Sequence, residues 1–161
     1  MKTPVLLLSL CLGLGLTACV GQKDATPVRD DPAQTNTTGT IATENPALEG
    51  KRWTLRTLNG QPVQTYPNQP EPHVVFTTEA GQGRVSGSDG CNLLVGSYTA
   101  NASSMELQHI GTTMMLCPKG ADQSRAFMKA LGDTTSWQQN GANLELRNAS
   151  TTLAVFENTA K

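Results

Sequence analysis

Side chains able to do hydrolytic chemistry are present in the 161-residue chain, but their spacing fits no common catalytic pattern. A serine-hydrolase elbow needs Gly-x-Ser-x-Gly, and the run from Gly83 to Gly90 places no serine between two such glycines. Gly81-x-Gly83 is followed by Gly87, which comes one residue too late for the glycine spacing of a dinucleotide-binding loop. Glu106 and Glu145 are carboxylates of the kind used in glycoside cleavage, but each falls on the polar face of a predicted strand. We therefore expect no enzymatic activity.

A metal site would need several His, Cys or carboxylate side chains that converge. The two histidines, His73 and His109, lie in separate predicted strands, and neither a His-x-x-x-His nor a Cys-x-x-Cys spacing occurs. Thioethers suit Cu(I), which leaves a copper site open for the unclustered methionines Met105, Met114, Met115 and Met128. We expect Met114 and Met115 to fill the edge of the core instead, and the chain to carry no metal or other cofactor.

The first 18 residues have the composition of an export signal, with Lys2 followed by an apolar run and then by small residues. Leu16-Thr17-Ala18-Cys19 resembles the lipobox of bacterial lipoproteins. The resemblance implies cleavage before Cys19 and acylation of that cysteine, which would anchor the chain to a membrane. Val20 follows in place of Asp, which implies the outer membrane, facing the periplasm. An ordinary signal peptide that happens to end near a cysteine is the alternative.

Two cysteines remain when Cys11 is assigned to the signal and Cys19 to the lipid. Cys91 and Cys117 would form one pair in an oxidising compartment. A disulfide between them would close a loop of roughly 27 residues and stabilise the fold by about 3 to 4 kcal/mol. Two separately buried thiols and a redox-active pair are the alternatives, and the absence of Cys-x-x-Cys argues against the latter.

The elements that must position these residues follow from hydrophobic alternation. Residues 19–46 are rich in Thr, Asp, Asn and Pro and predict a flexible linker, residues 47–158 predict one domain, and residues 159–161 a short tail. A segment with Pro62, Pro67, Pro70 and Pro72 predicts no regular structure. One helix is predicted, with Asp122 as its cap, Phe127 and Leu131 on its apolar face and Gly132 at its end. Short strands are predicted at 53–57, 73–77, 84–86, 94–99, 105–110, 134–137, 144–147 and 152–156.

These elements predict an α+β fold, in which a curled antiparallel sheet or partly open β-barrel of about seven or eight strands carries one packed helix. The formal net charge of −1 and the lack of a basic stripe argue against nucleic-acid binding. We expect a monomer.

The order of several short motifs resembles the META domain of HslJ-type bacterial lipoproteins. Gly90-Cys91-Asn92 precedes Gly96-Ser97-Tyr98, and Thr113-Met114-Met115-Leu116-Cys117 precedes the helix, over a stretch from about 48 to 156. The motif residues of the resemblance are Gly90, Cys91, Asn92, Gly96, Tyr98, Thr113, Met115 and Cys117. The family usually has Glu at the position of Ser124, so a role that needs this carboxylate does not transfer.

The resemblance implies a non-catalytic envelope domain linked to heat shock, antibiotic resistance and envelope stress. A domain of this kind would bind a protein, peptide or lipid, and we expect an apolar groove lined by Trp53, Phe127 and Trp137 to be its binding site. A passive structural component with a fully packed interior is the alternative. A small hydrolase or a metal-binding protein is the less favoured interpretation.

Overall fold

The computed structural model of the chain describes residues 45–159. The predicted signal peptide, Cys19 and all but the last two residues of the predicted linker lie outside these residues. Within the described part, no helix is long and apolar enough to cross a bilayer.

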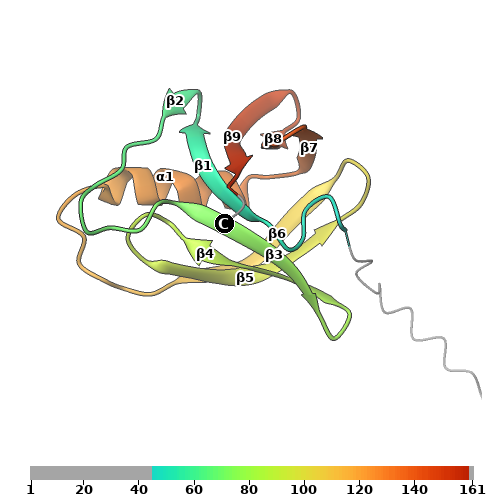
Figure 1. Ribbon diagram of the computed structural model, residues 1–161, viewed down its shortest axis with the longest axis horizontal. Coiled ribbons are helices and arrows are strands. Elements are labelled where there is room, and N and C mark those ends of the chain that lie inside the picture. The colour runs from blue at the N-terminus through green and yellow to red at the C-terminus, as the bar shows by residue number, and fades with distance from the viewer. Residues whose placement is uncertain (1–44, 160–161) are drawn as a thin grey trace, which may run out of the picture. The chain divides into compact units, whose positions relative to one another are not determined.

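A single antiparallel sheet forms the body of the domain (Figure 1). Eight strands follow one path in the order β6-β5-β4-β3-β1-β9-β8-β7, and the short β2 is appended to β1. The strands are β1 (Arg52–Leu58), β2 (Gln61–Pro62), β3 (His73–Glu79), β4 (Gln82–Ser88), β5 (Leu93–Ala100), β6 (Met105–Thr112), β7 (Ser136–Asn140), β8 (Asn143–Asn148) and β9 (Thr151–Asn158).

Tight turns fix the register between neighbouring strands. β1 turns into β2 through Asn59 and Gly60, which both have positive φ, and β7 turns into β8 around Gly141 at φ 61°. Such φ angles match the twist of two-residue hairpin loops and favour Asn and Gly. The Asn-Gly pairs of the sequence, Asn59-Gly60 and Asn140-Gly141, therefore lie at hairpin turns.

The Pro-rich segment departs from the prediction at its first residue. Pro62 belongs to β2 and lies opposite Thr57 of β1, although the sequence predicted no regular structure there. The neighbouring Val63 amide donates to the Arg56 carbonyl of β1 at 3.0 Å, so the Pro62 nitrogen faces the open edge, where no donor is needed.

The helix α1 (Ala121–Gly132) contributes the fully buried Phe127 and Leu131 to the core, as its apolar spacing predicted. Its cap differs from the prediction. Gly120 occupies the N-cap position with φ 81° and no side-chain cap bond, whereas Asp122 is a highly exposed residue of the first turn, paired with Arg125. The acidic group still complements the positive end of the helix dipole.

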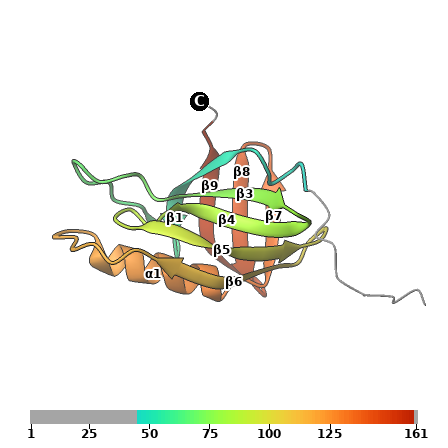
Figure 2. The ribbon, with the colours of Figure 1, turned by 90° about the horizontal axis from the view of Figure 1, so that it is seen from below.

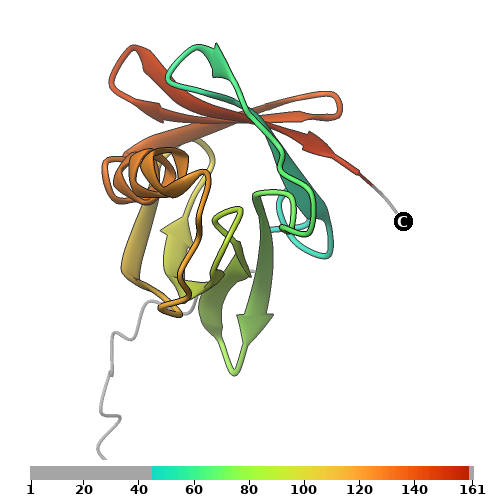
Figure 3. The same cartoon turned by 90° about the vertical axis from the view of Figure 1, so that its left-hand side faces the viewer.

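The sheet curls until its two ends approach each other (Figures 2 and 3). An isolated bridge joins Ser104, before β6, to Ser136 at the start of β7, and the Met105 amide donates to the Thr135 carbonyl at 3.2 Å. Beyond this bridge α1 packs along β6 in place of another strand. The predicted fold class, a curled antiparallel sheet with one packed helix, is confirmed.

Candidate functional site

A disulfide joins Cys91 to Cys117, with 6.1 Å between their Cα atoms. The prediction from cysteine counting is thus confirmed, and the separation lies in the usual range for bridged residues. Cys91 lies just before β5, and Cys117 lies between β6 and α1. The bridge therefore fixes the middle of the segment that connects β6 to α1.

The turn that carries Cys91 is organised by a buried carboxylate. Oδ1 of Asp89 accepts hydrogen bonds from the backbone N–H groups of Cys91 at 2.8 Å and Asn92 at 2.6 Å, and Oδ2 accepts one from the Ser124 hydroxyl at 2.5 Å. Buried charges are tolerated only with such partners. Ser124 thus links the first turn of α1 to the disulfide turn. Sequence reasoning missed Asp89.

Asn92 holds the segment between β6 and α1 through contacts with residues 21 and 23 positions further along the chain. Its Oδ1 accepts from the Met115 amide at 2.7 Å and from the Thr113 hydroxyl at 3.2 Å. The Thr113 amide in turn donates to the Leu93 carbonyl at 3.0 Å. Residues 113–117 are therefore fixed by hydrogen bonds at one side and by the disulfide at the other.

Three consecutive apolar residues of this segment, Met114, Met115 and Leu116, point into solvent and are called here the apolar tip. Their exposed fractions are 99%, 64% and 97%. The expectation that Met114 and Met115 fill the edge of the core was therefore wrong. Asn92 and Cys91 hold the segment on the side that faces the domain, so the three apolar side chains lie on the opposite, solvent-facing side.

Two residues on the outer face of β5 extend the apolar surface. Leu93 and Val95 are 65% and 62% exposed, and Thr113 at the base of the tip exchanges two hydrogen bonds with Leu93. A hollow of about 260 Å³ lies at the base of the tip, lined by Cys91, Asn92, Met115, Leu116, Cys117, Ala121, Ser124 and Arg125. Met115 and Leu116 thus belong to both the tip and the hollow, and Thr113 connects the tip segment to Leu93.

The predicted groove is replaced by packed core. Trp53 and Phe127 are fully buried and Trp137 is 8% exposed, and all three belong to the central hydrophobic cluster. Phe127 packs against Phe156 with ring centroids 5.9 Å apart, and the indole N–H of Trp53 donates to the Leu48 carbonyl at 2.8 Å. The three aromatic residues lie where helix and sheet meet, so neighbouring elements cover the faces that were expected to be open.

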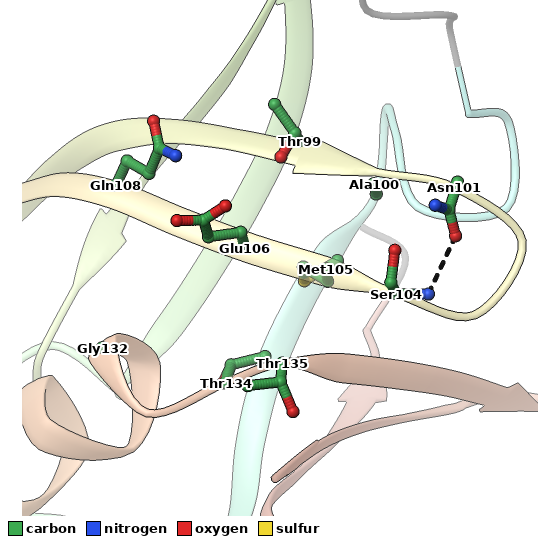
Figure 4. A pocket seen from close by; sticks show the side chains of 10 residues that line it. All are labelled: Thr99, Ala100, Asn101, Ser104, Met105, Glu106, Gln108, Gly132, Thr134 and Thr135. Carbon is green, nitrogen blue, oxygen red and sulfur yellow. Dashed lines mark hydrogen bonds between the residues drawn. The ribbon is translucent and has the colours of Figure 1, made fainter. Parts of the chain in front are cut away.

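A further hollow, of about 680 Å³, is an open depression between the start of β6 and the end of α1 (Figure 4). Thr99, Ser104 and Glu106 line its strand side, and Thr134 and Thr135 line its helix side. The Thr134 hydroxyl donates a hydrogen bond to the Ala130 carbonyl, and the Ser104 amide donates one to Asn101 Oδ1 at 3.0 Å. Part of its polar lining is thus committed to local structure.

Two further motif residues, Gly96 and Tyr98, contribute to packing within the domain. Gly96 lies close to β6, where a side chain would collide with Ile110. Tyr98 is buried, packs edge-on against Phe76 and donates from its hydroxyl to Glu49 at 2.7 Å. Burial and the adjacent Glu49 carboxylate raise the pKa of Tyr98. Burial alone would raise the pKa of Glu49, but the hydrogen bonds donated by Asn45, Tyr98 and Thr78 outweigh it and hold that pKa below its usual value.

The methionines and histidines that were considered for metal binding differ in burial and do not form a cluster. Met105 is buried and Met128 packs against the core, while Met114 and Met115 face solvent. His73 is bonded through Nδ1 to the Glu71 carbonyl at 2.8 Å, and burial lowers its pKa. Within residues 45–159, no group of three His, Cys, Asp or Glu side chains is arranged to hold a metal ion.

Fold and site together define a small barrel-like domain of one curled sheet and one helix, in which a disulfide supports an exposed apolar loop. The META domain model matches residues 46–160, and the chain belongs to the META domain family. The finer HslJ-type assignment stays a prediction. No curated protein matches the chain.

Two solved structures, both determined by NMR, share the fold. One has a TM-score of 0.53 and 23% identity, and the match covers 68% of this chain and 91% of that chain. The other, from Burkholderia xenovorans, has a TM-score of 0.55 and 23% identity, with coverage of 71% and 85%. At this identity the likeness concerns the fold alone.

Proposed function

We propose that the protein is a lipid-anchored envelope protein whose META domain is a non-catalytic binding module, with the apolar tip as its contact surface. The observation that carries the proposal is the exposure of Met114, Met115 and Leu116 on a segment held by hydrogen bonds and a disulfide. Contiguous exposed apolar surface is costly in water and marks interaction sites.

Preorganisation strengthens this interpretation. The backbone of the tip is already fixed by Asn92 and by the Cys91–Cys117 bridge, so binding orders little more than side chains. Methionine side chains are flexible and polarizable, and they adapt to irregular apolar surfaces. The tip therefore combines a rigid base with a deformable contact area, which suits a binding role.

Anchoring through an acylated Cys19 belongs to the same proposal. The disulfide supports export, because such bonds persist in oxidising compartments outside the cytosol. More than one acyl chain is needed for stable anchoring, which a modified amino-terminal cysteine supplies. By the lipobox resemblance we place the protein at the outer membrane, facing the periplasm, with a role in envelope or stress homeostasis.

A passive structural component is the second candidate. The observation that favours it is the packed interior, because Trp53, Phe127 and Trp137 belong to the hydrophobic core and do not line an open groove. A passive domain, however, gains nothing from three exposed apolar residues. The two candidates thus differ in what happens when the tip is changed.

Complementation tests the proposal. Host cells that lack the native protein receive the full chain as wild type, as Leu116→Asp, or as Ala102→Asp, which places the same charge on the exposed β5–β6 turn. All three chains should unfold at the same temperature, because both sites are exposed. We expect survival under heat or antibiotic stress to be restored by wild type and Ala102→Asp and lost with Leu116→Asp. Equal rescue by all three chains would favour the passive component.

A further inference from the structure

We infer that Met114 and Met115 are sites of reversible oxidation to methionine sulfoxide, and that this modification disables the contact made by the apolar tip. The inference rests on the proposed function, in which the tip is the contact surface, and it does not depend on which molecule the tip contacts. It adds a modification site and a form of regulation.

Exposure divides the methionines of the described chain into two groups. The side chains of Met114 and Met115 are 99% and 64% exposed, on a segment that projects at one end of the domain (Figure 2). Met105 is 2% exposed, and Met128 is partly buried against the core. An oxidant in solution reaches a buried thioether only when the fold opens, whereas it reaches the tip at all times. The fold thus directs oxidation to the tip and shields the core.

The reaction is a two-electron oxygen transfer from a peroxide. The thioether sulfur attacks one peroxide oxygen, so that an S–O bond forms as the O–O bond breaks, and hydrogen peroxide leaves as water while the sulfur is oxidised. A methionine sulfoxide reductase reverses the change, because two thiols supply two electrons, the sulfoxide oxygen leaves as water and a disulfide forms between the thiols. One cycle therefore adds and removes one oxygen and leaves the chain unchanged.

Oxidation changes the polarity of the tip without loosening its base. A sulfoxide oxygen accepts hydrogen bonds, and a contact that buries it against an apolar surface leaves this acceptor without a partner. Binding should weaken by about tenfold for each sulfoxide buried in this way. The base is held by the hydrogen bond from the Met115 amide to Asn92 and by the Cys91–Cys117 bridge, and neither uses a thioether. The oxidised domain should therefore stay folded and lose only its contact.

Leucine and glutamine separate the apolar character of the tip from its sensitivity to oxidants. Leucine is apolar and has a similar volume to methionine, but it has no sulfur to oxidise. Glutamine is unbranched and, like the sulfoxide, places a polar oxygen near the end of the side chain. Met114→Leu/Met115→Leu is therefore a tip that cannot be disabled, and Met114→Gln/Met115→Gln is a tip that is always disabled.

Peptide mass spectrometry measures the modification on the full chain, which is treated with hydrogen peroxide in lysates of cells that produce it. We expect Met114 to gain oxygen first and Met115 next, and Met105 to react at least about tenfold more slowly than either, because it needs an opening of the fold. Methionine sulfoxide reductases for both epimers, supplied with a dithiol, should restore the tip. Oxidation of Met105 as fast as that of Met114, or tip sulfoxides that the reductases do not remove, would overturn the inference and leave the proposed function intact.

Complementation measures the consequence of the modification. Host cells that lack the native protein receive the full chain as wild type, as the double leucine variant or as the double glutamine variant. Each culture is stressed with or without a prior pulse of hydrogen peroxide, and the mass of the tip peptide verifies oxidation of the wild type. We expect the pulse to abolish rescue by wild type but not by the leucine variant, and the glutamine variant to give no rescue although it unfolds at the wild-type temperature.

The remaining outcomes separate the inference from the proposed function. Equal sensitivity of wild type and the leucine variant to the pulse would overturn the regulation and leave the tip as a contact surface. Full rescue by the glutamine variant without a pulse would overturn the proposed function together with the inference.

Discussion

Removal of the Cys91–Cys117 bridge should lower the stability of the domain by a calculable amount. The bridge joins residues 26 positions apart. For a loop of this length the chain-entropy relation gives a stabilisation of about 3.5 kcal/mol at room temperature. A domain of this size loses about 4 °C in melting temperature per kcal/mol, so the midpoint should fall by about 14 °C. Alanine at both positions is the cleanest change, because Cys91 is buried and a serine hydroxyl there would lack a partner.

Thermal unfolding followed by circular dichroism measures this difference. The oxidised wild-type domain should melt well above the Cys91→Ala/Cys117→Ala variant, and a phosphine reductant should bring the wild type to the variant's midpoint. The variant itself should not respond to the reductant, which makes it the control for other effects of the reagent. A wild-type midpoint that does not move on reduction would refute the reasoning, because the bridge would then contribute nothing to folding.

Three further changes test the surroundings of the site. Phe127→Ala should cost about 3 to 5 kcal/mol in chemical denaturation, as expected for a core ring; a loss under about 1 kcal/mol would restore the groove interpretation. Ser124→Ala should cost about 1.5 to 3 kcal/mol by removing a hydrogen bond to the buried Asp89 carboxylate, and Ser124→Glu should cost more through like-charge repulsion; equal stability of the three chains would contradict the assigned contact. The folded-state pKa of Glu49 lies below its usual value, so its contribution is complete above pH 4.5 and disappears as the pH falls through the folded-state pKa. Unfolding free energies at about pH 6 and about pH 3.5 should therefore differ less in Glu49→Gln than in wild type, and an identical difference in both would refute the Glu49 contribution.

Much of the fold could be predicted because its signals are local. Alternation around Trp53, the Asn-Gly turns and the Phe127–Leu131 spacing each act within a few residues, and each marks an element that the structure contains. The disulfide was also predictable, because assigning Cys11 to the predicted signal and Cys19 to the predicted lipid left one pair of cysteines.

The character of the site depends on contacts that are distant in sequence. Asp89 acquires its role from Ser124, 35 residues away, and no local pattern signals this bond. The direction of Met114 and Met115 follows from anchors at Asn92 and Cys91, whereas apolarity alone predicts burial. For the same reason, aromatic side chains at Trp53 and Trp137 could not reveal whether their open faces are covered by neighbouring strands.

The most direct test of the central claim is the intact mass of the mature protein extracted from membranes. The proposed function needs a chain that is held in the envelope through an acylated Cys19 at its mature amino terminus. We predict a polypeptide that begins at Cys19 and carries acyl chains, and we predict that Cys19→Ala removes both the added mass and the palmitate label. A mature chain in the soluble fraction that begins at another residue, with no added lipid mass, would contradict the account.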